Sequence, residues 1–119
     1  MKSLIVLSAL LLAGCSDATE RQHQLLMQDI EQRVQLPEHT KKLHNYARYY
    51  ATDGGHVIGV YITDFDQQNR YYDLPIGQRR WIEQARDLPS ISDGGCTVVH
   101  IDYNPKNRGT PHAFCNGRA

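Results

Sequence analysis

The sequence lacks an excess of charge of either sign. Its 13 lysine and arginine residues balance 13 aspartate and glutamate residues, so the formal net charge at pH 7 is zero. Adjacent basic residues occur only at Lys41-Lys42 and Arg79-Arg80. Because nucleic-acid binding needs a concentrated basic footprint on one surface, the composition excludes nucleic acid as an expected partner.

The sequence also lacks an apolar run long enough to cross a bilayer as a helix, which takes about 20 residues. The longest run, residues 4–12, follows Lys2 and is interrupted by Ser8 and Ala9. A short apolar run after a positive residue at the amino terminus is typical of a signal peptide, which has to be left out of fold reasoning. Removing residues 1–14 leaves 105 of the 119 residues, enough for one domain with a modest core.

The four residues at 12–15 are Leu-Ala-Gly-Cys. They resemble the lipobox of bacterial lipoproteins, in which leucine and two small residues precede an obligatory cysteine. The resemblance implies that residues 1–14 are cleaved and that Cys15 becomes the lipidated first residue of the mature protein. Several acyl chains, palmitate among them, would anchor the chain stably to the lipid bilayer. By the same resemblance, Ser16 rather than aspartate after the cysteine implies the periplasmic face of the outer membrane.

Cysteine is otherwise scarce, since only Cys96 and Cys115 remain. Two cysteines in an exported chain predict one disulfide, and the spacing does not favour the alternative of metal ligation because no C-x-x-C motif is present. The enclosed segment carries the turn residues Asn104-Pro105, so we expect an antiparallel hairpin. With the two cysteines facing each other, Val98 would lie opposite Ala113.

Residues 17–36 contain neither glycine nor proline, and Pro37 follows. Their apolar residues recur at helical spacing and predict an amphipathic helix that packs on the core. Residues 43–51 also fit a helix, but Asp53-Gly54 between apolar runs is a strong hairpin signal, which we favour. The apolar positions of the predicted helix are Leu26, Met27, Ile30 and Val34.

Further strands are predicted at residues 56–65, 70–72, 79–82, 97–103 and 112–116, because these segments are rich in β-branched and aromatic residues and are separated by turn residues. The expected fold is therefore α+β. An N-terminal helix packs on a four- or five-stranded antiparallel meander, stapled by one disulfide, and residues 15–119 form a single periplasmic domain.

Catalytic and metal-binding patterns are weak. His100 and Asp102 share one face of a predicted strand, and three interpretations remain open: a general base with its orienting carboxylate, half of a metal site with His112, or the wet face of a half-buried sheet. The wet face is the favoured interpretation, because neither thiol is free and no serine lies in a G-x-S-x-G turn. We therefore assign no catalytic residue, no metal and no cofactor.

Tyrosine is abundant, with seven residues, and alternation along strands predicts that some tyrosines face outward. Aromatic residues interleaved with arginines are typical of protein-binding surfaces, although tyrosine also suits cross-strand pairs on an exposed sheet. The candidate binding face comprises Tyr71, Arg79, Arg80 and Trp81.

The resulting hypothesis is a non-enzymatic periplasmic lipoprotein that binds another envelope protein through the outer face of its sheet. Lipoproteins of this size and build include accessory subunits of envelope complexes, inhibitors of cell-wall hydrolases and immunity proteins, and the resemblance in class implies a role of this kind. The alternative is a small envelope enzyme or ligand-binding module that uses His100, Asp102 and His112.

Overall fold

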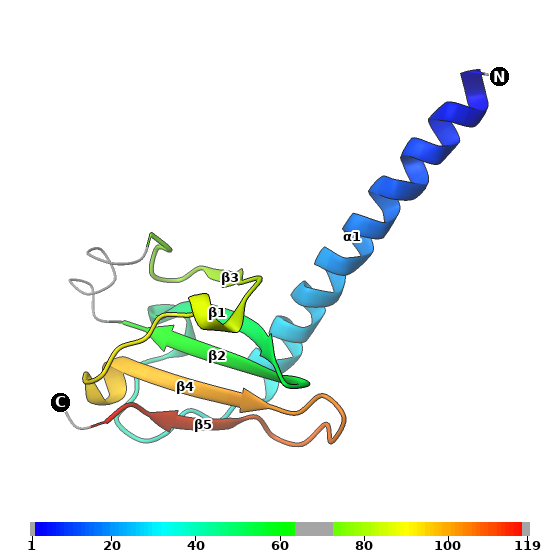
Figure 1. The fold of residues 1–119 in the computed structure, drawn as a ribbon. Helices are drawn as coiled ribbons and strands as arrows, with labels where there is room; N and C mark the ends of the chain where they lie inside the picture. The colour runs from blue at the N-terminus through cyan, green and yellow to red at the C-terminus, as the bar shows by residue number, and fades with distance from the viewer. Residues whose placement is uncertain (1, 64–72, 118–119) are drawn as a thin grey trace.

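The structure is a computed structural model that describes the backbone of residues 2–63 and 73–117 and the side chains of residues 17–63 and 73–117. One long helix leads into a small sheet with short helical turns between the strands (Figure 1). The elements are α1 (Lys2–Arg33), η1 (Leu43–Asn45), β1 (Ala47–Asp53), β2 (His56–Ile62), β3 (Arg79–Trp81), η2 (Ala85–Asp87), η3 (Gly95–Thr97), β4 (Val98–Tyr103) and β5 (His112–Cys115).

The five strands form one sheet in the order β3-β1-β2-β4-β5, which confirms an α+β fold and corrects the expected meander. All neighbours are antiparallel except β1 and β3, which run parallel. β4 pairs with the far edge of β2 and β5 with the far edge of β4, while β3 pairs with the remaining edge of β1. Arg48 lies beside Arg79 on one side of β1, while Ala47 lies beside Ile62 on the other.

The hairpin expected around Asp53-Gly54 is confirmed, and the alternative of a helix there is wrong. β1 and β2 pair over their whole length, from Ala47 to Asp53. Gly54 and Gly55, between the two strands, have φ of 57° and 84°. Two successive residues with positive φ match the right-handed twist of the flanking strands, so glycines favour a tight turn at this point.

The predicted helix is present, but α1 ends at Arg33, four residues before Pro37. Its N-terminal part extends well beyond the sheet, and only its C-terminal part packs on it (Figure 1). Met27 and Ile30 are fully buried there, which confirms the predicted apolar stripe. α1 includes residues 2–14, the segment predicted to be cleaved. None of the described helices is long and apolar enough to span a membrane.

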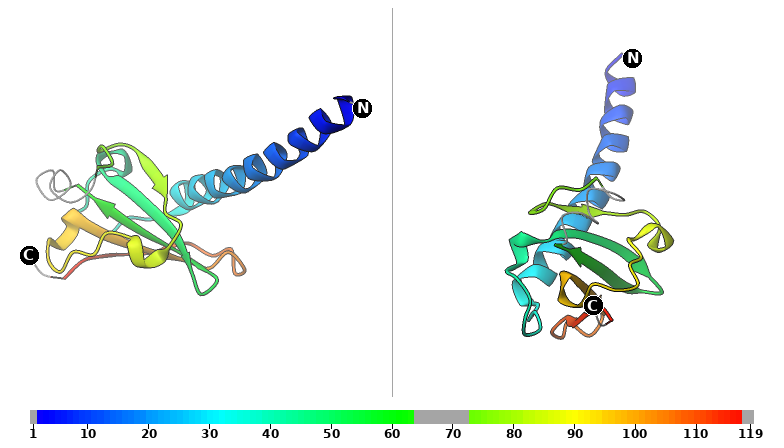
Figure 2. Two further views of the ribbon diagram at one scale, coloured as in Figure 1. Left: turned by 45° about the horizontal axis from the view of Figure 1, so that its top comes forward. Right: turned by 90° about the vertical axis from the view of Figure 1, so that its left-hand side faces the viewer.

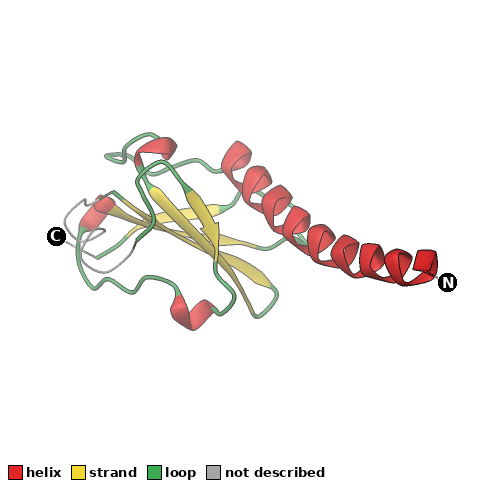
Figure 3. Cartoon of the chain, turned by 90° about the horizontal axis from the view of Figure 1, so that it is seen from above, coloured by secondary structure: helices red, strands yellow, loops and turns green. Residues whose placement is uncertain are grey.

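Both faces of the sheet carry a buried cluster, and the strand tyrosines among the described residues are all buried, which corrects the expectation that some of them face outward. Tyr71 and Tyr72 lie outside the described residues. α1 covers one face, and residues 82–91 contribute to the cover of the other (Figures 2 and 3). Alternate residues of a strand therefore enter two different cores. Tyr50 packs beneath α1, whereas its neighbour Tyr49 packs on the opposite face. The buried tyrosines are Tyr46, Tyr49, Tyr50, Tyr61 and Tyr103.

The disulfide between Cys96 and Cys115 is confirmed, with an S–S distance of 2.06 Å. The expected register of the hairpin is wrong, because Cys115 lies opposite Val99 rather than Cys96. Cys96 belongs to η3, which precedes β4, and the adjoining Gly94 and Gly95 have φ of 115° and 55°. The turn through these glycines brings Cys96 back toward the end of β5, so the disulfide closes one end of the sheet.

Candidate functional site

A buried cluster of charged and hydroxyl groups joins α1 to the sheet and fixes the position of β3. Glu31 of α1, whose side chain is only 10% exposed, accepts hydrogen bonds from Arg48 Nε at 3.0 Å, Tyr50 Oη at 2.7 Å and Arg79 Nη1 at 3.1 Å. A hydrogen bond joins the hydroxyls of Tyr50 and Tyr61. Burial, followed by the neighbouring charges, holds the pKa of Tyr50 well above its usual value.

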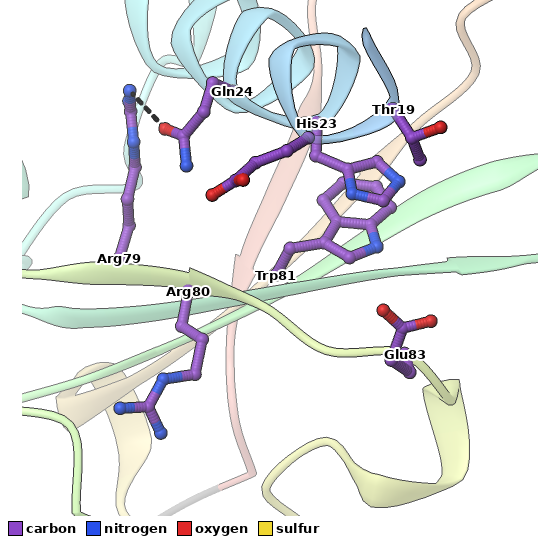
Figure 4. Close-up of a pocket in the computed structure, with 8 residues that line it drawn as sticks. Thr19, His23, Gln24, Arg79, Arg80, Trp81 and Glu83 are labelled. Carbon is purple, nitrogen blue, oxygen red and sulfur yellow. Dashed lines mark hydrogen bonds between the residues drawn. The ribbon is translucent and has the colours of Figure 1, made fainter. Parts of the chain in front are cut away.

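Beside this cluster, α1 and β3 enclose an open pocket of about 580 Å³ (Figure 4). His23 of α1 and Trp81 of β3 stack in parallel, with ring centroids 4.0 Å apart and planes 6° apart. The stack brings two segments far apart in the sequence into direct contact. The residues that line the pocket, which we call the α1–β3 pocket, are Thr19, Glu20, His23, Gln24, Arg79, Arg80, Trp81 and Glu83.

The two arginines of the pocket are already paired. Arg79 donates to Glu31 and, at 3.4 Å, to the side-chain oxygen of Gln24. Arg80 extends away from α1 (Figure 4) and donates to Asp73 Oδ1 at 2.9 Å. The Arg80 guanidinium lowers the pKa of the Asp73 carboxyl. Both guanidinium charges are thus compensated by carboxylates outside the pocket lining.

The two glutamates of the pocket are exposed, and neither Glu20 nor Glu83 forms an ion pair or hydrogen bond with the described residues. Glu83 lies just beyond the end of β3, on the side of the pocket where Trp81 and Thr19 are found (Figure 4). The half of the pocket around the aromatic stack therefore presents the exposed carboxylate of Glu83.

The structure brings together only part of the predicted binding face. Arg79 and Trp81 point toward α1, while Arg80 points to the other face of β3, because side chains alternate along a strand. Tyr71 lies outside the described residues. Sequence reasoning missed His23. Its position four residues before Met27 places it on the buried side of α1, and that spacing was the available signal.

The second group of candidates, His100, Asp102 and His112, lies on the sheet face opposite α1. Asp102 Oδ1 is 2.6 Å from Nδ1 of His56 in β2, and Asp102 pairs in register with His112. These residues line a small pocket of about 250 Å³. His100 is separate, because its Nε2 hydrogen-bonds Asn116 Oδ1 at 3.1 Å. Sequence reasoning missed His56, which carried no motif.

This second group is a solvent-facing cluster. The side chains of His56 and Asp102 are 43% and 45% exposed. Phe114, itself 44% exposed, lies between two histidine rings at 5.3 Å from each. In the part of the chain that the structure describes, no three His, Cys, Asp or Glu side chains form a group that could hold a metal ion. The exposure of these side chains fits the interpretation of a wet sheet face.

Comparisons with protein-family models, with curated proteins and with solved structures found no match to this chain. The α1–β3 pocket is larger than the pocket beside His112, and it combines an aromatic stack with side chains from α1 and β3.

Proposed function

We propose that the mature chain is a lipid-anchored envelope protein, not an enzyme, that binds another envelope protein at the α1–β3 pocket. The observation that carries the proposal is the half-buried Trp81, stacked on His23 in an open pocket that two arginines also line. Tryptophan and arginine are enriched among the few residues that carry most of the binding energy of protein interfaces. The proposal replaces the outer sheet face of the sequence hypothesis with the junction of α1 and β3.

The position of the pocket along α1 supports a partner at the membrane. The helix is continuous from residue 15 into the domain. With a rise of about 1.5 Å per residue, His23 lies about 12 Å along the helix from Cys15. If Cys15 carries the lipid, the pocket is held next to the bilayer surface. A partner that is itself embedded in or anchored to the membrane can then contact the pocket at the bilayer surface.

The lipobox resemblance and Ser16 support the periplasmic face of the outer membrane as the location. An accessory subunit, an inhibitor of a cell-wall hydrolase and an immunity protein all bind a protein partner, and each fits the proposal. The anchor is tested by Cys15→Ala. We expect loss of cleavage after residue 14 and loss of membrane fractionation, whereas unchanged processing and fractionation would contradict the lipoprotein assignment.

Partner binding is tested by crosslinking in living cells, with a photoreactive amino acid in place of Glu83. We expect a specific crosslinked protein that mass spectrometry identifies. The matched control places the same group at Glu38, an exposed residue beyond the opposite end of α1, and should not capture that protein. Equal capture at both positions, or none at position 83, would contradict the proposal.

A charge reversal provides an independent test. Arg80→Glu breaks an exposed pair with Asp73, the one ion pair that Arg80 forms with the described residues, so the fold should be unaffected. We expect co-purification of the crosslinked partner to fall severalfold. Lys42→Glu, at an exposed lysine distant from the pocket in sequence, changes the net charge equally and should leave co-purification unchanged.

A further inference from the structure

One side of α1 is left largely uncovered by the sheet, and it continues onto the loop between β4 and β5. We propose that this surface, which we call the anchor surface, lies on the lipid bilayer and binds negatively charged phospholipid headgroups. The inference rests on the lipid anchor of the proposed function and deepens it by orienting the domain on the membrane. The anchor surface comprises Gln22, Leu25, Leu26 and Asp29 of α1 and residues 104–110 of the loop.

Cys15 belongs to the same side of α1 as the anchor surface. Gln22 and Leu25 follow it by seven and ten residues. At about 3.6 residues per turn, these intervals return close to one side of the helix. A different side, with Met27 and Ile30, packs on the sheet. Acyl groups on Cys15 would therefore hold the anchor surface, and not the sheet, toward the bilayer.

The α1 part of the anchor surface is apolar and open. Leu25 is 57% exposed, and together with Gln22, Leu26 and Asp29 it lines a hollow of about 420 Å³. Leu25 lies about 15 Å along the helix from Cys15, at a rise of about 1.5 Å per residue. Both residues reach the lipid at once only if α1 lies along the bilayer surface. Interfacial helices are held in this way, with their apolar side at the headgroup boundary.

The loop part of the anchor surface is cationic and is tied to α1. Arg33 Nη1 donates to the backbone carbonyl of Arg108 at 2.6 Å, and the loop lies at the end of the sheet from which α1 extends (Figures 1 and 2). The side chains of Lys106 and Arg108 are exposed, and neither forms an ion pair with the described residues. Asp29, the one acid of the anchor surface, pairs with Arg33 at 3.0 Å. The charge left unbalanced is positive, and an anionic bilayer surface attracts it.

The other charged and functional groups of α1 are compatible with this orientation. Asp17 and Glu20, the acids nearest to Cys15, follow it by two and five residues, which places them on other sides of the helix. They are therefore directed away from the headgroups. His23 and Gln24 of the α1–β3 pocket also lie on another side, so the pocket stays open to a protein partner while the anchor surface is on lipid.

The test uses the mature acylated chain in vesicles of phosphatidylcholine and phosphatidylglycerol, with a nitroxide spin label on one introduced cysteine. Acylation and the disulfide occupy the native cysteines, so the introduced thiol is the only free one. Gln22→Cys and Asn107→Cys place the label on the anchor surface. Asp87→Cys is the matched control, because Asp87 is an exposed residue of η2, on the other face of the sheet.

The readout is the accessibility of each label to oxygen, which dissolves in lipid, relative to a neutral nickel chelate, which stays in water. We expect a higher ratio of oxygen to chelate accessibility at positions 22 and 107 than at position 87. Labels at 22 and 107 that are as accessible to the chelate as the label at 87 would overturn the inference.

Charge variants test the contact with the headgroups. Lys106→Gln and Arg108→Gln should each lower the ratio of docked to undocked chains by about fivefold, as read from the label at position 22. Lys41→Gln and Lys42→Gln, at exposed bases outside the anchor surface, should leave the ratio unchanged. Vesicles of phosphatidylcholine alone should reproduce the loss. Unchanged docking in both loop variants, or equal docking on the uncharged vesicles, would overturn the role of the anionic headgroups.

A mass spectrum of the purified chain separates this inference from the proposed function. If acyl groups are present but the labels at 22 and 107 stay in water, the lipid anchor stands and the orientation fails. If these labels lie in lipid while position 83 captures no protein, the orientation stands and partner binding fails. A chain without acyl groups overturns both. A photoreactive group at Asn107 that captures a protein in living cells would make the occupant a protein and would overturn the inference.

Discussion

Glu31 is the residue whose removal should be most costly for the fold. It accepts hydrogen bonds from Arg48, Tyr50 and Arg79, and its own side chain and that of Arg48 are only 10% and 9% exposed. Glu31→Ala leaves the Arg48 guanidinium buried without its counter-charge. Removing one partner of a buried ion pair costs about 3–5 kcal/mol. Small domains have a total stability of about 5–15 kcal/mol, so a large share would be lost.

The measurement is urea unfolding of the full chain in detergent, followed by the emission of Trp81. We expect Glu31→Ala to unfold at a lower urea concentration, with an unchanged dependence of the unfolding free energy on urea. The variant loses stability, but unfolding still exposes the same amount of surface. Glu38→Ala is the matched control, since Glu38 is exposed, and it should stay within about 0.5 kcal/mol of the parent.

If Glu31→Ala lowered the free energy of unfolding by less than about 1 kcal/mol, the reasoning would be refuted. So small a cost would mean that water reaches the Arg48 guanidinium in the variant and stabilises its charge. If the alanine variant fails to fold, Glu31→Gln provides the measurement. Glutamine retains an oxygen that accepts the hydrogen bond of Tyr50 but loses the charge. The free energy of unfolding of Glu31→Gln should therefore lie between those of the parent and the alanine variant.

Three further outcomes follow from the packing. Gly59→Ala places a Cβ 3.0 Å from Cβ of Ile101, and this overpacking should lower the unfolding free energy by about 1–3 kcal/mol in urea melts. Reduction of Cys96–Cys115 should cost about 3 kcal/mol, measured by urea unfolding with and without reductant. Burial raises the pKa of Tyr61 above its usual 10.0, so its contribution to stability is complete below pH 10 and is lost as pH rises further, which urea melts at pH 8 and 11 would detect.

Local signals in the sequence predicted the elements that depend on neighbouring residues. The 3.6-residue spacing of Met27 and Ile30 identified the packed face of α1, and both are fully buried. Gly54, with its positive φ, identified the hairpin between β1 and β2. The export context predicted the Cys96–Cys115 disulfide. Each of these features has a local signal in the sequence: a helical spacing of apolar residues, a pair of turn residues, or two cysteines in an exported chain.

The features that depend on long-range pairing could not be predicted. Nothing in the sequence of residues 79–81 distinguishes a strand that continues a meander from one that adds in parallel to β1. The burial of both Tyr49 and Tyr50 requires cover on both faces of the sheet, and that cover comes from α1 and residues 82–91. The residue pattern of one strand cannot show whether the second face of that strand contacts water or another segment of the chain.

The candidate site shows the same limit in its charges. Arg79-Arg80 is one of only two basic pairs in the sequence, and both arginines belong to the predicted protein-binding face. On a strand the two side chains point to opposite faces, where Glu31 and Asp73 compensate them. The carboxylates that the described residues leave unbalanced belong to other positions. A basic pair in the sequence therefore does not establish a positive surface, because the ion pairs formed in the fold decide which charges remain to meet a partner.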